Sequence, residues 1–214
     1  ILWGDLARRY TSLGQFDKAE HALQVARLLA PNSRYLLRSQ VRFLVHLGEP
    51  DRAVRMLEKC SRTLEDPWLM ASLLSVASQS GSALPGRKRV RRLLEDDDFR
   101  SIERSELASE AGTLEIRNGS NRPGLRMLQA ALATPTDNSL AQVEWVSRRF
   151  RVLDVDFGEF VVPFPDEALA RSAAQEGAWH DALTHAERWM DDQPFDSGAA
   201  VLGSYVASIG LEDW

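Results

Sequence analysis

Few residues of this chain have the types and spacing that catalysis or metal binding requires. Its four histidines are dispersed, at His21, His46, His180 and His185, and are typical of solvated helix positions. The nearest two, His180 and His185, would point about 140° apart on one helix and do not form a metal-binding pair. The sequence also contains no glycine-rich phosphate loop, no nucleophile elbow and no His-Glu-x-x-His motif. We therefore expect no enzyme activity, no metal and no cofactor.

Two acidic clusters and the single cysteine have structural interpretations. Asp154, Asp156 and Glu159 resemble half of a calcium loop, but the glycine falls at the wrong offset and the closing bidentate glutamate is absent. The acidic run at residues 95–98 is typical of a solvated helix end. Cys60 excludes an internal disulfide because it is alone, and we expect it to be buried and inert.

The most basic segment is residues 87–92, in which five positive charges surround Val90. Such a run can bind nucleic acid or a nuclear-import receptor. However, Val90, Leu93 and Leu94 form an apolar stripe through it, as on a helix that packs on one side and is solvated on the other. The four acids that follow offset its field. We therefore expect a solvated helix face and do not expect nucleic acid as the partner.

The composition is that of a soluble globular protein, with 44% hydrophobic and 27% charged residues. No uninterrupted apolar run reaches the roughly 18 residues that a membrane span needs. Arginine greatly outnumbers lysine, 23 to 3, which is typical of a GC-rich bacterial genome. The chain begins with Ile1 rather than methionine, and we expect it to be a piece of a longer, cytoplasmic protein.

The net charge of −5 is unevenly distributed along the chain. Residues 1–63 hold 11 basic and 6 acidic side chains, a net charge of +5. Residues 154–214 hold 2 basic and 13 acidic side chains, a net charge of −11. A polarised charge of this kind either steers partners to one end of the molecule or reflects ordinary solvated faces.

The elements that must position any site follow a repeat. Gly14 and Gly48 are 34 residues apart, as are Ala19 and Ala53. Each glycine ends one helical pattern, and glycine suits this place because the chain turns left-handed after a helix. The same turn position recurs at Gly81, Gly119, Gly177 and Gly210. Small residues follow the turns at a fixed distance, including Ala19, Ala53, Gly124 and Ala182, and would let two antiparallel helices approach closely.

This pattern resembles the tetratricopeptide repeat (TPR), a 34-residue helix–turn–helix unit. The first copy holds most of the family signature, at Trp3, Leu6, Tyr10, Gly14, Ala19, Ala26 and Pro31. The resemblance implies an all-α fold: a right-handed α-solenoid of antiparallel helix pairs, in which stacked neighbours bury one another's apolar stripes. We expect repeats 1–4 at residues 1–33, 34–66, 67–100 and 101–138, and a fifth repeat with a truncated half repeat at residues 164–214.

Residues 139–163 interrupt the period, because Gly119 and Gly177 are 58 residues apart. Residues 139–149 are predicted to form an amphipathic helix, and residues 151–165 to form extended chain that ends at two prolines. A new helix is then expected to begin at Asp166. This insertion is either a place of specific function or a degenerate repeat.

The resemblance also implies where a partner would bind. The first helix of each repeat lines a concave face in TPR proteins, and the corresponding positions are Arg8, Tyr35, Arg38, Arg42, His46 and Trp68. Arginine offers a planar fork for carboxylates, and aromatic rings offer broad contact. We therefore expect a protein- or peptide-binding scaffold or sensor region with an acidic partner. The alternatives are a nucleic-acid-binding repeat that uses the basic N-terminal half, and the regulatory region of an enzyme whose catalytic domain lies outside this chain.

Overall fold

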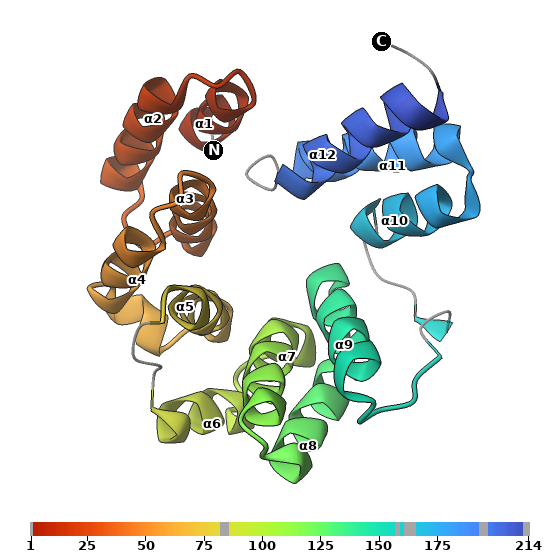
Figure 1. The fold of residues 1–214 in the computed structure, drawn as a ribbon. Helices are drawn as coiled ribbons and strands as arrows, with labels where there is room; N and C mark the ends of the chain where they lie inside the picture. The colour runs from red at the N-terminus through yellow and green to blue at the C-terminus, as the bar shows by residue number, and fades with distance from the viewer. Residues whose placement is uncertain (1, 82–85, 157–158, 161–165, 193–196, 212–214) are drawn as a thin grey trace. The chain divides into compact units, whose positions relative to one another are not determined.

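The computed structural model describes residues 2–81, 86–156, 159–160, 166–192 and 197–211. All regular structure in these residues is helical, with no β-strand among them (Figure 1), so the predicted all-α class is confirmed. The α-helices are α1 (Leu2–Ser12), α2 (Phe16–Leu29), α3 (Arg34–His46), α4 (Pro50–Glu58), α5 (Pro67–Ser80), α6 (Arg87–Glu95), α7 (Ser101–Arg117), α8 (Asn121–Ala131), α9 (Asp137–Phe150), α10 (Asp166–Glu176), α11 (Trp179–Asp192) and α12 (Ser197–Tyr205). A 3₁₀-helix, η1 (Ser61–Leu64), precedes α5, and a π-helix, η3 (Val206–Gly210), follows α12.

Five of the six predicted turn glycines have the left-handed conformation that the repeat requires. Gly14, Gly48, Gly81, Gly119 and Gly177 have φ values of 68°, 75°, 71°, 80° and 73°. The residue after the turn often donates its N–H back into the preceding helix, as from Gln15 to the Tyr10 carbonyl at 2.8 Å and from Ser120 to the Glu115 carbonyl at 2.8 Å. These bonds satisfy carbonyls that the helix end leaves open. The predicted helix boundaries at these glycines are confirmed.

The sixth candidate, Gly210, is not a turn glycine. It ends the π-helix η3 and has no positive φ. The ring of Trp179 lies against it so closely that a Cβ at this position would overlap ring carbons. Gly210 therefore provides room for an aromatic ring and not for a reversal of the chain.

The chain forms two compact units. The first contains α1, α2 and α3 together with α10, α11 and α12, and the second contains helices α4 to α9. In the first unit α1 packs against α2 and α3, and α10 packs against α11. The small residues Ala19 and Ala182 are fully buried here, as the repeat predicts, and Ala53 is fully buried in the second unit.

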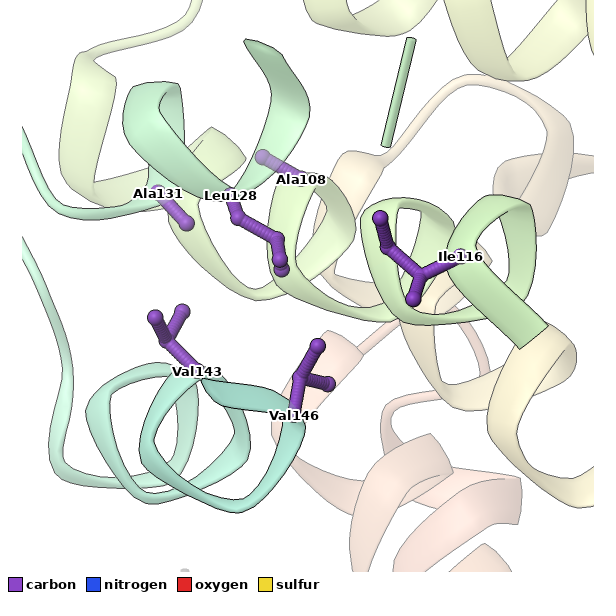
Figure 2. Close-up of a cluster of buried hydrophobic side chains, with 6 residues drawn as sticks. All are labelled: Ala108, Ile116, Leu128, Ala131, Val143 and Val146. Carbon is purple, nitrogen blue, oxygen red and sulfur yellow. The ribbon is translucent and has the colours of Figure 1, made fainter. Parts of the chain in front are cut away.

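In the second unit the first helices of successive pairs pack side by side, α5 against α7 and α7 against α9. Figure 2 shows the apolar core that α7, α8 and α9 share, formed by Ala108, Ile116, Leu128, Ala131, Val143 and Val146. The helix predicted at residues 139–149 thus exists, and it contacts α7 in the same way that α7 contacts α5. It behaves as the first helix of another pair.

The end of α9 shows how this pair is degenerate. Arg151 caps the helix with a φ of 53°, and it is the one non-glycine residue with positive φ in the described parts of the chain. It stands 32 residues after Gly119 and 26 before Gly177, so it occupies the missing turn position. Residues 151–156 then form neither helix nor strand. The predicted extended segment therefore has no regular structure where it is described, and residues 157–158 and 161–165 of it lie outside the described residues.

Candidate partner-binding surfaces

Helix α3 exposes one narrow stripe and buries the rest of its surface. Its buried residues are Leu36, Leu37, Arg38, Ser39, Gln40, Val41, Phe43 and Leu44. Tyr35, Arg42 and His46 are at least partly exposed, and their spacing places them with Arg38 within an arc of about 80° on a regular helix. The helix contains three arginines and no acidic residue. The predicted site residues of α3 therefore share its most exposed face, which is aromatic and basic.

Arg38 differs from the expectation, because an exposed contact residue was predicted and this side chain is only 8% exposed. Neighbouring side chains on α3 at residues 36–41 are also buried, so the stripe is interrupted at this position. Arg42 is more accessible, and no ion pair engages it among the described residues. Arg42 is therefore the better candidate to meet a carboxylate.

The ends of the α3 stripe are fixed by aromatic and helix contacts. Tyr35 is 40% exposed, and one ring carbon would lie 3.5 Å from a Cβ added at Gly4 of α1. At the other end His46 packs edge-to-face on Phe16 of α2, with ring centroids 5.6 Å apart. Neither ring is loose on the surface, so a ligand on this face would meet side chains that are already positioned.

Two predicted residues lie on other helices. Arg8 is half-buried on α1, which packs against α3 in the same unit. Trp68 is half-buried at the start of α5, where the Asp66 carboxylate caps the helix by accepting the N–H groups of Trp68 at 3.0 Å and Leu69 at 3.2 Å. Trp68 belongs to the second unit, and it is described only there.

The basic run at residues 87–92 forms most of α6 and has acidic neighbours. Arg87 pairs with Glu115 of α7 at 2.9 Å, and Arg91 pairs with Glu95 at 2.7 Å. Val90 and Leu93 are buried, as the apolar stripe predicts. Two of the five charges are thus paired with carboxylates, which agrees with the expected solvated face.

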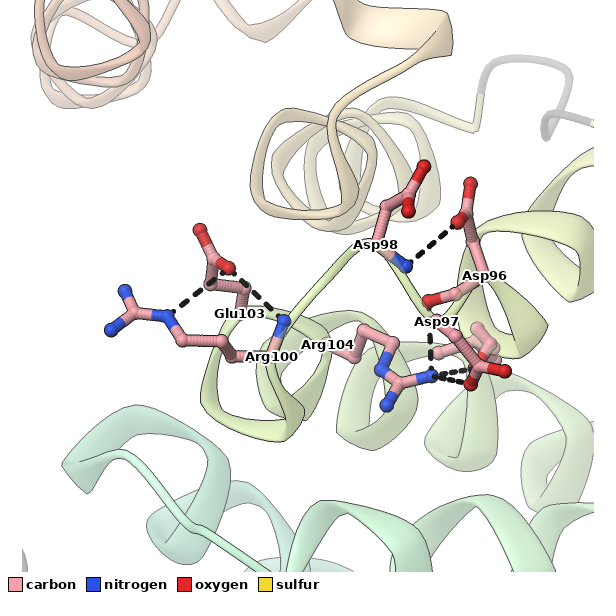
Figure 3. Close-up of polar contacts among 7 residues, drawn as sticks. Asp96, Asp97, Asp98, Arg100, Glu103 and Arg104 are labelled. Atoms are coloured by element: carbon pink, nitrogen blue, oxygen red, sulfur yellow. Dashed lines mark hydrogen bonds and ion pairs between the residues drawn. The ribbon is translucent and has the colours of Figure 1, made fainter.

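The acidic run is an ordered connection between α6 and α7 (Figure 3). The Nη1 atom of Arg104 donates to the backbone carbonyls of Leu94 at 3.0 Å and Asp96 at 3.1 Å, and lies 4.0 Å from the Asp97 carboxylate. The Asp98 N–H donates to the Asp96 side chain at 3.1 Å. Arg104 therefore fastens the start of α7 to the end of α6.

Two predictions about single residues need correction. Cys60 is half-exposed and not buried, because α4 ends at Glu58 and the cysteine lies in the link to η1. His185 is not simply solvated, since its Nδ1 atom lies 2.8 Å from the Asp166 carboxylate at the start of α10. The helix that was predicted to begin at Asp166 does so, and this contact joins it to α11.

A buried polar seam between α7 and α9 was not predicted from the sequence. Ser105 donates to Ser139 at 2.7 Å, Ser109 donates to Gln142 at 3.0 Å, and the Gln142 amide donates to Glu110 at 2.5 Å. Ser105 and Ser139 are 34 residues apart, so one repeat position is hydrogen-bonded to its own next copy. That spacing is the signal that could have found the seam.

Glu110 is the unusual member of this seam. Burial raises the pKa of its carboxyl group above the ordinary value, although the hydrogen bond from Gln142 and the charge of Arg117 act in the opposite direction. The carboxylate is held by an amide and not by a close cation.

Comparisons with known proteins identify no relative: no family model matches the chain, and no curated protein matches its sequence. In the described ranges, no three His, Cys, Asp or Glu side chains are grouped as a metal ion would need. No described helix is both long enough and apolar enough to cross a membrane.

Proposed function

We propose that this chain is a TPR-like α-solenoid that binds an acidic protein segment or peptide along the exposed stripe of α3. The single observation that supports this most is the asymmetry of α3, which buries eight residues and leaves Tyr35, Arg42 and His46 accessible on one face. A first helix enclosed in this way offers a ligand one stripe only, with a guanidinium between two rings.

The chemistry of the stripe suits a carboxylate-bearing ligand. The Arg42 guanidinium can form two parallel hydrogen bonds with a carboxylate, and Tyr35 and His46 add contact area at low entropic cost. The absence of an acidic residue from Arg34 to His46 leaves no local competitor on the helix. Screening should weaken such binding, because exposed charges interact over about 8–10 Å at physiological ionic strength.

The test uses a panel of fluorescent peptides that range from acidic to basic and have free or amidated C-termini. Their binding is measured by anisotropy at about 50 mM and about 300 mM salt. We expect acidic peptides to bind best and to weaken with salt. Arg42→Glu should abolish this binding, whereas Arg55→Glu, an equal charge change at an exposed position of α4, should leave it unchanged.

Three results would contradict the proposal. Basic or neutral peptides could bind as well as acidic ones, Arg42→Glu and Arg55→Glu could have equal effects, or a single-stranded oligonucleotide could displace the peptides and bind more tightly. The last outcome would favour the nucleic-acid alternative. Circular dichroism of both variants checks that the helices are intact.

A further inference from the structure

The first helices of successive pairs can be compared at one position, eleven residues before the turn residue. In α3, α5, α7 and α9 this position is Leu37, Met70, Ala108 and Leu140, and each of them is at most 8% exposed. Each of these helices packs against helices that precede it in the chain. In α1 the same position is Trp3, which is 39% exposed. The face of α1 that a preceding pair would cover is therefore open.

The open face of α1 is hollowed. Trp3, Leu6 and Tyr10 of α1 and Ala22 of α2 line an apolar cavity of about 260 Å³, with Asp17, Lys18 and His21 at its edge. The Lys18 ammonium lies over the Tyr10 ring, 5.6 Å from its centroid. Such a hollow fits an apolar ridge with acidic flanks.

Helix α12 presents a ridge of this kind. Val201, Tyr205 and Ile209 are spaced four residues apart, and they are 68%, 50% and 59% exposed. The other side of this helical segment packs on α11, where Ala199 and Val206 are buried and Trp179 contacts Tyr205 edge-to-face with centroids 6.5 Å apart. The ridge is thus held by its own packing and remains uncovered.

The charges around the two faces are opposite. Residues 1–63 carry a net charge of +5, and residues 154–214 carry −11. Close to the faces, Arg9 is exposed on α1, and Asp181, Glu187 and Asp191 are exposed on α11, the helix against which α12 packs. Opposite potentials favour contact between unlike faces and oppose contact between like faces.

We propose that the open face of α1 binds the α12 ridge of a second copy of this chain, head to tail. Val201, Tyr205 and Ile209 of one copy fill the hollow lined by Trp3, Leu6 and Tyr10 of the next. Each contact leaves a free hollow at one end and a free ridge at the other, so the association continues beyond a dimer. Helical repeats without polar terminal faces expose this kind of surface.

Sedimentation of the intact chain over a range of concentrations tests the proposal directly. We expect the average mass to rise with concentration and to exceed that of a dimer, and the association to weaken between about 50 mM and about 500 mM salt. A chain that stays monomeric throughout at low salt overturns the proposal.

Two variants identify the faces. Trp3→Glu removes the hollow and Tyr205→Glu removes the ridge, and each alone should be monomeric because one half of every contact is lost. Mixed in equal amounts, they should form a dimer and nothing larger, since each still supplies one intact face. A mixture that stays monomeric, or that assembles beyond a dimer, overturns head-to-tail contact.

Controls separate this result from unfolding and from general stickiness. Val201→Glu, at a more exposed ridge position, should repeat the effect of Tyr205→Glu, and thermal melts of all variants should match the parent chain. Leu169→Glu removes an equally exposed leucine of α10 and should assemble as the parent does. If Leu169→Glu is monomeric, the contact uses α10 and the proposed faces are wrong.

Discussion

At the scale of the residue, Arg151 shows a cost that the sequence pattern concealed. It takes a left-handed conformation at the place where five other pairs use glycine. A side chain in this conformation costs about 1–2 kcal/mol relative to glycine. The repeat thus tolerates one strained turn, and the reason that arginine stands there is not visible in its contacts.

Arg151→Gly should therefore stabilise the fold by about 1 kcal/mol. Arg149→Gly is the matched control, because it removes the same charge two residues earlier, inside α9. It should destabilise the fold by about 0.5–1 kcal/mol. Urea denaturation measures both, and a destabilised Arg151→Gly would show that the turn is not left-handed in solution.

Glu110 permits a second prediction at this scale. Its folded-state pKa is raised by burial, so between the ordinary glutamate pKa of about 4.3 and that raised value the folded state binds more protons than the unfolded state. Its contribution to stability therefore falls as pH rises through this window. Above the window the full penalty of a buried carboxylate remains.

Glu110→Gln keeps an oxygen that can accept the Gln142 amide and removes the charge. We expect a higher melting temperature than the parent at pH 7 and little difference at pH 4. Glu95→Gln, at an exposed position, provides the control for loss of a charge. A melting temperature difference that is the same at both pH values would contradict a raised pKa.

At the scale of the element, α7 and α8 cross at two glycines. A Cβ added at Gly124 would lie 2.7 Å from Ile116 Cγ1 and 2.9 Å from the backbone oxygen of Gly112. A Cβ at Gly112 would lie 3.0 Å from the backbone oxygen of Gly124. The backbones cannot separate without opening the core of Figure 2, in which Leu128 and Ile116 are buried.

Gly124→Ala should consequently destabilise the protein by about 1–3 kcal/mol, although alanine is the better helix former. The same substitution at Gly203 of α12 should have the opposite sign. A Cβ there would meet Ala186 at 3.7 Å, an ordinary contact, and the gain in helix propensity is about 1 kcal/mol. Equal melting temperatures for the two variants would argue against a close crossing.

At the scale of the whole molecule, the two proposals use different surfaces of the same basic N-terminal region. Both interactions should weaken with salt, so salt alone cannot distinguish them. Their variants can. Arg42→Glu should lose peptide binding and retain self-association, whereas Trp3→Glu should do the reverse. A single variant that abolished both would indicate one shared site, and anisotropy and sedimentation on the same samples decide this.

The sequence by itself determined the local structure of this protein. Helix positions follow from apolar periodicity, and helix ends follow from Gly14, Gly48, Gly81, Gly119 and Gly177, because left-handed turns favour glycine whatever packs nearby. The helix at residues 139–149 and the burial of Ala19, Ala53 and Ala182 were also predictable, since both depend on the repeat period.

Only the tertiary structure decided which of those residues are accessible and which are partnered. Arg38 and Arg42 look alike in sequence, yet one is buried, because burial depends on the helices that pack opposite and not on residue type. Cys60 lost its predicted burial where α4 ended early. The seam from Ser105 to Glu110 formed because α9 lies against α7, a contact between residues more than 30 apart. Local rules do not fix such a contact, since it arises from packing between pairs.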